Sequence, residues 1–213
     1  MAADETAPLG LRERKKQETR TALSWATIRL SVERGWDDVT VEDIAAEANV
    51  SVRTFRNYFS SKAEAVVARH VDRMLHVADD LRARPADEPL PEAIRHAVLA
   101  RFAPEPGDDR PPRSREWLDQ WVKGIRLMLT EPDVQAEFVK VNLIVQKELA
   151  EAIAERTGTD ATRDLYPTLV AAATGAATTA AIDHWLRSDD PTVPVGALLN
   201  DALDRLWAGL PVP

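Results

Sequence analysis

Arg53, Arg56 and Asn57 lie within one short segment and are residue types that read DNA bases. The two donors of an arginine side chain match O6 and N7 of guanine, and an asparagine amide can pair with N6 and N7 of adenine. Val52 precedes them and can contact a thymine methyl group. The alternative is an ordinary solvated face of a surface helix. Base reading requires that these side chains share the outer face of a helix that enters the major groove. The flanking residues show whether the sequence forms such a helix.

The segment from Thr40 to Lys62 has the pattern of two short helices joined by a tight turn. Thr40 is a favourable N-cap residue, and Asp43 stands where the acid of a capping box stands. Residues 49–51 interrupt the apolar pattern, and Ser51 can cap a second helix from Val52 to about Phe59. The residues expected to face inward are Val41, Ile44, Ala45 and Ala48 in the first helix, and Phe55 and Phe59 in the second. The pattern is typical of a helix-turn-helix.

The stretch from about Arg14 to Lys62 resembles the DNA-binding domain of the TetR family of bacterial repressors. The residues that carry the resemblance agree in order, spacing and type: Val32-Glu33-Arg34-Gly35-Trp36, Thr40-Val41-Glu42-Asp43-Ile44-Ala45, Val50-Ser51, Thr54-Phe55, Tyr58-Phe59 and Lys62. Trp36 replaces the usual Phe or Tyr and keeps an aromatic core residue. Asn49 replaces the usual turn glycine, and asparagine tolerates the left-handed backbone conformation.

The resemblance implies a division of labour among the DNA-contacting residues. Thr40, Thr54, Tyr58 and Lys62 are placed like phosphate contacts of the family, and the charge of Lys62 would add to the amides at a helix N-terminus. The basic run at 12–16 can reach the DNA backbone or the minor groove, although such runs are often only solvated. The expected DNA-contacting set is Thr40, Ser51, Val52, Arg53, Thr54, Arg56, Asn57, Tyr58 and Lys62.

The overall charge of −8 is unusual for a DNA-binding protein, but its distribution is not. Residues 1–62 contain 10 basic and 10 acidic side chains, whereas the remainder contains 17 basic and 25 acidic ones. DNA binding needs a local basic surface, and an acidic body disfavours nonspecific adhesion elsewhere. The absence of cysteine excludes disulfides, thiol nucleophiles and cysteine metal sites.

The 213 residues predict an all-α chain of nine helices, three in an N-terminal helix-turn-helix domain and six in a C-terminal ligand-binding and dimerisation domain. We expect a disordered tail at 1–11, the DNA-binding domain at 12–61 and the helical body at 62–213. The first helix is expected over about 14–34, a long helix over 62–83, and the penultimate helix over about 162–187. Ser114 is expected to cap the sixth helix, and Thr192 and Pro194 to start the last.

One recognition helix covers only a few base pairs, so specific binding needs two copies, and we expect a homodimer on a palindromic operator. The C-terminal helices offer surfaces for this dimer. A stripe of small residues in the penultimate helix would let two subunits approach closely: Ala172, Gly175, Ala176, Thr179 and Asp183. The last helix has a broad apolar face from Val195 to Trp207. In TetR-like proteins the last two helices of each subunit form a four-helix interface. The alternative is that these faces are buried within one subunit.

Bulky apolar residues and a few polar ones in the body resemble the lining of an effector cavity in this family. The candidates are His96, Phe102, Trp117, Trp121, Met128, Phe138, Asn142 and Gln146. The apolar lining favours a hydrophobic or amphipathic ligand, and the body loosely resembles members with an acyl-CoA-like binding domain. The alternative is an ordinary filled core with exposed amides.

The sequence therefore predicts a cytoplasmic, ligand-responsive repressor of transcription, with operator DNA, a small-molecule effector and a second copy of the chain as partners. A helical binding or adaptor protein with a vestigial helix-turn-helix is the alternative. We expect no catalytic residue, metal site or cofactor, because the chain has no Gly-x-Ser-x-Gly turn, no His-Glu-x-x-His and no glycine-rich phosphate loop. No apolar run is expected to reach the length of a membrane span.

Overall fold

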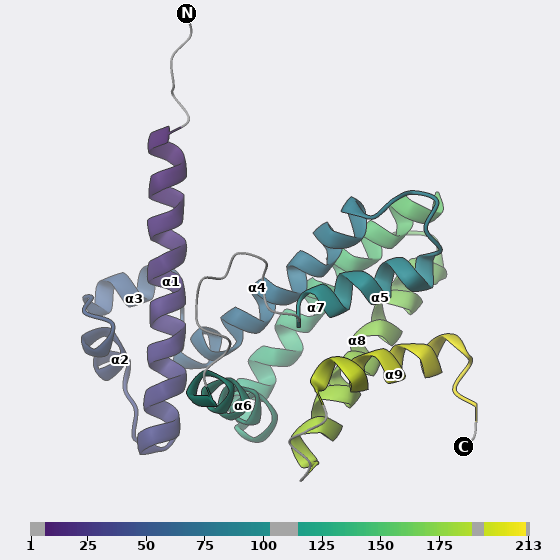
Figure 1. The fold of residues 1–213 in the computed structure, drawn as a ribbon. Helices are drawn as coiled ribbons and strands as arrows, with labels where there is room; N and C mark the ends of the chain where they lie inside the picture. Colours follow the sequence, from purple (N-terminus) through teal and green to yellow (C-terminus); the bar gives the residue numbers. More distant parts are fainter. Residues whose placement is uncertain (1–6, 103–114, 189–193, 212–213) are drawn as a thin grey trace, which may run out of the picture. The chain divides into compact units, whose positions relative to one another are not determined.

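The computed structural model describes residues 7–102, 115–188 and 194–211. Helices account for nearly all of the secondary structure in these ranges, which contain no strand, and the all-α prediction is confirmed (Figure 1). The nine helices of the described ranges are α1 (Ala7–Arg34), α2 (Val41–Glu47), α3 (Val52–Tyr58), α4 (Lys62–Ala83), α5 (Leu90–Ala100), α6 (Arg115–Thr130), α7 (Pro132–Thr157), α8 (Leu165–Arg187) and α9 (Val195–Trp207).

Two helix starts differ from the sequence prediction. α1 begins at Ala7, so the last residues of the expected disordered tail are helical. Pro8 is tolerated there because it lies in the first turn of the helix. The pairs Arg14–Glu18 and Glu13–Lys16, just beyond the expected tail, have the i, i+4 and i, i+3 spacings that support a helix. α8 begins at Leu165, because Pro167 is best accommodated in the first turn of a helix. The expected caps Ser114 and Thr192 lie outside the described residues.

Contacts divide the chain into two compact units. Unit 1 comprises Met1–Arg69 and Glu116–Phe138, and unit 2 comprises His70–Arg115 and Val139–Pro213. The first eight residues of α4 belong to unit 1 and the rest to unit 2. The expected boundary between the DNA-binding domain and the helical body, at residue 62, stays a prediction.

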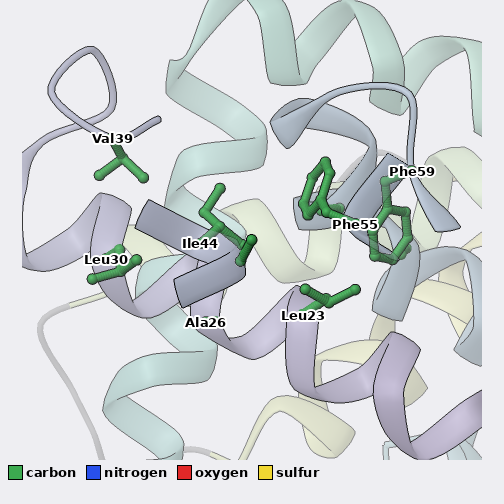
Figure 2. Close-up of a cluster of buried hydrophobic side chains, with 10 residues drawn as sticks. Leu23, Ala26, Leu30, Val39, Ile44, Phe55 and Phe59 are labelled. Atoms are coloured by element: carbon green, nitrogen blue, oxygen red, sulfur yellow. The ribbon is translucent and has the colours of Figure 1, made fainter. Parts of the chain in front are cut away.

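The core of unit 1 joins the first three helices (Figure 2). Leu23 and Leu30 from α1 meet Ile44 from α2, Phe55 from α3 and Phe59, the residue that ends α3. Phe55 is fully buried, and its ring centroid lies 5.7 Å from that of Phe59. The inward faces predicted for α2 and α3 are therefore confirmed at these positions.

The turn chemistry of unit 1 follows the local sequence closely. Thr40 and Asp43 form the predicted capping box at the start of α2. Asn49 has φ of 53°, the left-handed conformation that the turn requires. Ser51 caps α3 by accepting a hydrogen bond from the backbone N–H of Thr54 at 3.0 Å. These local devices set the angle between α2 and α3.

Two contacts fasten α1 to later helices of unit 1. The buried Ser24 hydroxyl donates a 2.6 Å hydrogen bond to the backbone carbonyl of Ala65 in α4. Gly124 in α6 lies so close to Ile28 that a Cβ there would be 3.3 Å from the isoleucine side chain. Both contacts join residues far apart in the chain, so α4 and α6 help to hold the helix on which α2 and α3 pack.

In unit 2, α9 packs against α8 and α5 (Figure 1). The buried face of α8 includes Val170, Ala171 and Ile182, and α9 contributes the fully buried Leu199 and Leu203. Arg95 of α5 forms an ion pair with Asp204 of α9 at 2.7 Å. These contacts fix α8, α9 and α5 as one cluster.

α8 is long and apolar enough to cross a membrane by length and composition, with a mean hydropathy of 1.3 over its most apolar window. This differs from the expectation that no run reaches that length. The criterion is also met by core helices of globular proteins, and α8 has such a core face, including the buried hydroxyl-bearing residues Thr174 and Thr178.

Candidate nucleic-acid interface

The outer face of α3 presents the three predicted base-reading side chains together. Arg53, Arg56 and Asn57 are all exposed, whereas Phe55 on the opposite face is fully buried. The buried aromatic anchors fix the rotation of this short helix about its own axis. Two guanidinium groups and an amide therefore project from one rigid, solvent-facing surface, which is the arrangement that base reading requires.

The residues that flank this surface are partly committed to local structure. Val52, Thr54 and Tyr58 are half-buried. The hydroxyls of Ser51 and Thr54 lie 2.8 Å apart and hydrogen-bond to each other at the start of α3. Ser51 Oγ also accepts the Thr54 backbone N–H at 3.0 Å. Within the hydroxyl pair one group donates to the other, and the accepting hydroxyl keeps its own proton, which it can donate to a phosphate.

Thr40 is more tightly held. The carboxylate of Asp43 accepts the Thr40 backbone N–H at 2.9 Å and its hydroxyl at 2.5 Å, and the Thr40 hydroxyl oxygen accepts the Asp43 backbone N–H at 3.1 Å. These bonds from Thr40, first from its side chain and then from its backbone, lower the pKa of Asp43, and Arg34 adds to the effect. The hydroxyl of Thr40 is therefore used in the cap of α2, as both donor and acceptor.

Lys62 is directed toward the protein in this structure. Its ammonium donates to the backbone carbonyl of Trp36 and, at 3.1 Å, to that of Val39, and it lies 4.3 Å from the centroid of the Trp36 ring. Sequence reasoning placed Lys62 at the DNA backbone and did not foresee these partners. They are 26 and 23 residues away in the chain, and no local pattern marks such a contact.

The basic residues of α1 have acidic or aromatic neighbours. Arg14 pairs with Glu18 and Lys16 with Glu13, both as exposed ion pairs. The guanidinium of Arg20 lies 5.4 Å from the centroid of the Phe59 ring, at the end of α3. The side chain of Arg12 lies outside the described part of the structure. The basic run at 12–16 thus lies within α1, and its side chains from residue 13 to 16 are exposed.

The candidate effector residues fall in both units. In unit 1, Met128 is buried and Phe138 half-buried. The side chains of Trp117 and Trp121 lie outside the described residues. In unit 2, His96 is exposed, with Nδ1 2.7 Å from a carboxylate oxygen of Glu88.

One of the remaining unit 2 candidates, Asn142, contacts His70, a histidine that sequence reasoning did not select. Phe102 is buried, and the guanidinium of Arg73 lies 5.6 Å from its ring centroid. Asn142 hydrogen-bonds to the side chain of His70. Burial first, and then the charge of Arg73, lower the pKa of His70 to about 4, while the bond to Asn142 opposes this shift. The imidazole is therefore neutral at pH 7.

Gln146 lies beside α8: a Cβ at Gly175 would be 3.6 Å from the Gln146 side-chain nitrogen. This member of the small-residue stripe therefore packs against α7 within the subunit. Ala176 and Thr179 of the same stripe are exposed.

The sequence is similar to known regulators over almost its whole length. The family model described as "Bacterial regulatory proteins, tetR family" matches residues 25–68, and the model described as "MftR C-terminal domain" matches residues 88–211. The HTH-type transcriptional regulator TcmR of Streptomyces glaucescens is 30% identical over 206 residues, which cover 92% of this chain and 86% of the relative.

Two further proteins extend the comparison. The putative mycofactocin biosynthesis transcriptional regulator MftR of Mycobacterium tuberculosis is 28% identical over 200 residues, covering 92% of this chain and 93% of the relative. The crystal structure of Thermus thermophilus FadR, a TetR-family repressor in complex with lauroyl-CoA, has a TM-score of 0.55 at 20% identity and covers 91% of this chain and 96% of that one. This structure shares the fold. Because its two halves match these models and a relative at 30% identity spans the chain, the protein belongs to the TetR family of helix-turn-helix, DNA-binding transcriptional regulators.

Proposed function

We propose that the chain is a ligand-responsive repressor that binds a palindromic operator as a homodimer and releases it when a hydrophobic or amphipathic molecule binds. The observation that carries this proposal is the outer face of α3, where Arg53, Arg56 and Asn57 are exposed over a buried aromatic anchor. The membership of the family supplies the regulatory context.

In this proposal the α3 residues divide between bases and phosphates. Arg53 and Arg56 read guanines, Asn57 reads an adenine, and Val52 contacts a thymine methyl group. Thr54 and Tyr58, with Ser51 and Thr40 at the helix starts, contact phosphates and fix the register on the duplex. Ser51 Oγ also accepts the Thr54 backbone N–H, and of the two paired hydroxyls the one that accepts keeps its own proton for a phosphate.

The proposed dimer uses the exposed side of α8 together with α9. Leu165 and Leu169 are 75% and 56% exposed, and Ala176 and Thr179 continue the exposed side toward the end of the helix. Large exposed apolar residues in a row are costly in a monomer and favour burial against a second subunit. Two subunits would present their recognition helices about one helical turn apart, or about 34–36 Å, or somewhat more.

The proposed effector carries an apolar part. Phe102 and Met128 are buried apolar candidates, one in each unit, and Asn142 with its partner His70 offers polar groups in unit 2. The lauroyl-CoA bound by the Thermus FadR suggests an acyl-CoA as the first ligand to test. His96, Trp117, Trp121, Phe138 and Gln146 complete the proposed contact set.

Release would follow from a population shift. α4 is continuous from Lys62 to Ala83 and contributes to both units. A ligand with different affinities for two positions of α4 would shift the spacing of the paired recognition helices, and this differential affinity is all that induction requires. No enzymatic step is part of the proposal, and a regulator of this kind works in the cytoplasm, where the DNA is.

The decisive experiment is selection of operator duplexes from a random pool, followed by binding at increasing salt. We expect a palindromic motif and an affinity that falls steeply, with a slope of log K against log salt of about −0.9 for each neutralised phosphate. A flat salt dependence with no selected motif would contradict the proposal and favour the adaptor alternative.

The effector is tested on the same complex. Lauroyl-CoA, coenzyme A alone and lauric acid are titrated separately into protein bound to fluorescent operator. Release by lauroyl-CoA alone indicates an acyl-CoA effector, whereas release by lauric acid indicates recognition of the apolar chain. If none of a broader set of apolar metabolites releases the DNA, ligand-induced release is wrong even if operator binding is correct.

A further inference from the structure

Lys62, the first residue of α4, is held by two residues of the loop between α1 and α2, Trp36 and Val39. Its ammonium donates to the carbonyls of Trp36 and Val39 and lies against the Trp36 ring. An ammonium has three N–H groups, so two are used by these carbonyls and the charge is in a cation–π contact. Little donor capacity is left for a phosphate.

The position of Lys62 in the helix makes these contacts significant. A cation in the first turn faces the positive end of the helix dipole, which is unfavourable. Two carbonyl acceptors and the negative face of an indole offset this repulsion. Lys62 is half-buried, and Trp36 and Val39 are 8% and 2% exposed. Because both partners are held in the core, the Lys62 side chain has less freedom to move than an exposed lysine.

The start of α4 also has its own anion in place. A carboxylate oxygen of Glu64 accepts the Ser60 backbone N–H at 2.7 Å and the Ser60 hydroxyl at 2.6 Å. Ser61 in turn accepts the Glu64 backbone N–H at 3.1 Å. A DNA phosphate that approached this helix end would meet the negative charge of Glu64 and would compete for the same donors.

The loop that Lys62 holds leads directly into the DNA-contacting helices. Val39 is part of the core of unit 1 (Figure 2). Thr40, the next residue, caps α2. α2 packs against both α1 and α3. A change in the path of residues 36–39 would therefore be passed through α2 to the outward face of α3.

We propose that Lys62 is a positioning residue, which supports DNA affinity by fixing the 36–39 loop beneath α2 and α3 and makes no phosphate contact itself. The inference rests on the proposed operator binding for its affinity readout, but the contact itself can be tested without DNA.

The test compares Lys62→Met, which keeps the aliphatic stem, with Lys62→Gln, whose neutral amide can still donate to one carbonyl. Salt-dependent operator affinity is measured for each, with amide hydrogen exchange of residues 36–45 in the free protein. For Lys62→Met we expect about tenfold weaker binding, the size of one lost charge-assisted hydrogen bond. We also expect an unchanged salt slope and faster exchange in 36–45. Lys62→Gln should bind the operator more tightly than Lys62→Met and should exchange more slowly in residues 36–45.

A phosphate contact predicts the opposite pattern: the magnitude of the salt slope falls by about one in both neutral variants, and exchange is unchanged. That result would overturn the inference. A double-mutant cycle with Trp36→Leu adds a second criterion. Positioning through the loop makes the two affinity losses non-additive, whereas independent roles make them add.

The two proposals fail in distinguishable ways. If the unmodified protein selects no operator, the proposed function is wrong, and hydrogen exchange alone decides the role of Lys62. If operator binding is normal but Lys62→Met exchanges like the parent protein, only the Lys62 inference is wrong. Circular dichroism of each variant establishes that it is folded. If Lys62→Met does not fold, Lys62→Gln is used for the comparison of salt slope and hydrogen exchange.

Discussion

The Ser24 hydroxyl donates its hydrogen bond to the carbonyl of Ala65 across a sequence separation of 41 residues, and Ser24 and Ala65 are both fully buried. This bond fastens α1 to the first turn of α4. It is a buried polar link between two helices, so its geometry restricts how they can slide past each other.

Replacing Ser24 by alanine should lower the free energy of unfolding by about 1 kcal/mol, because the hydrogen bond is lost while the Ala65 carbonyl can keep its helical partner. Thr27→Val is the matched control, since the buried Thr27 hydroxyl bonds only to the Leu23 carbonyl of its own helix. Urea unfolding measures both. An equal loss in the two variants would show that the link to α4 adds no stability.

Asn49 provides a test of the turn between α2 and α3. Its φ of 53° costs about 1–2 kcal/mol for a residue with an ordinary side chain, so Asn49→Ala should destabilise the protein by about 1 kcal/mol. Asn49→Gly should be close to neutral. Asn57→Ala makes the same chemical change at an exposed helical position and should not be destabilising. Urea midpoints that fail to separate Asn49→Ala from Asn57→Ala would contradict the assignment.

The neutral His70 predicts a pH dependence of stability. Its folded-state pKa of about 4 lies below the ordinary value of 6.5, so the unfolded chain binds more protons between these values. The stabilisation is complete above pH 6.5 and is lost as the pH falls toward 4, by at most about 1.4 kcal/mol per pH unit. His70→Gln should flatten this part of the curve of unfolding free energy against pH. Identical curves for the two proteins would contradict a neutral, enclosed imidazole.

The two arginines of α3 should set sequence preference. Arg53→Ala or Arg56→Ala should reduce discrimination between the selected operator and a single-base variant by about 1–3 kcal/mol at one position. Arg163→Ala removes the same charge from an exposed site in unit 2 and serves as the control. Competition binding measures the discrimination. If Arg53→Ala and Arg56→Ala weaken all duplexes equally, the arginines contact phosphates and not bases.

The proposed dimer interface can be tested by placing a charge on each of two exposed apolar helix faces. Leu169→Lys on α8 should turn the proposed dimer into a monomer at micromolar concentration, because an unpaired ammonium would be buried between subunits. Leu143→Lys on α7 alters a leucine that is 65% exposed and should leave the dimer intact. Light scattering gives the mass. Dissociation by Leu143→Lys alone would move the interface to α7.

The local parts of this fold could be predicted from sequence, because their signals lie within a few residues. The capping box of Thr40 and Asp43, the turn at Asn49 and the inward Phe55 and Phe59 all follow from spacings of three or four. The outward face of α3 follows from the same spacings, since it is what the buried aromatic residues leave exposed.

The contacts between distant residues could not be predicted in this way. Lys62 has the spacing of a phosphate contact, but its carbonyl partners depend on the path of a loop more than 20 residues away. His70 is a single histidine in a long helix, and only the approach of Asn142 and Arg73 makes its environment unusual. The effector set remains a prediction for a similar reason, because the surroundings of each side chain depend on residues far away in the chain and no periodic pattern encodes them.

The approach of Gly124 to Ile28 bears on how the protein can be dissected. Ile28 is only 5% exposed with α6 in place. A recombinant headpiece that stopped at residue 69 would leave this isoleucine facing water and would lack its natural neighbour. We therefore expect that the DNA-binding part folds on its own only if residues 116–138 are included. A designed linker would then have to replace the intervening residues 70–115.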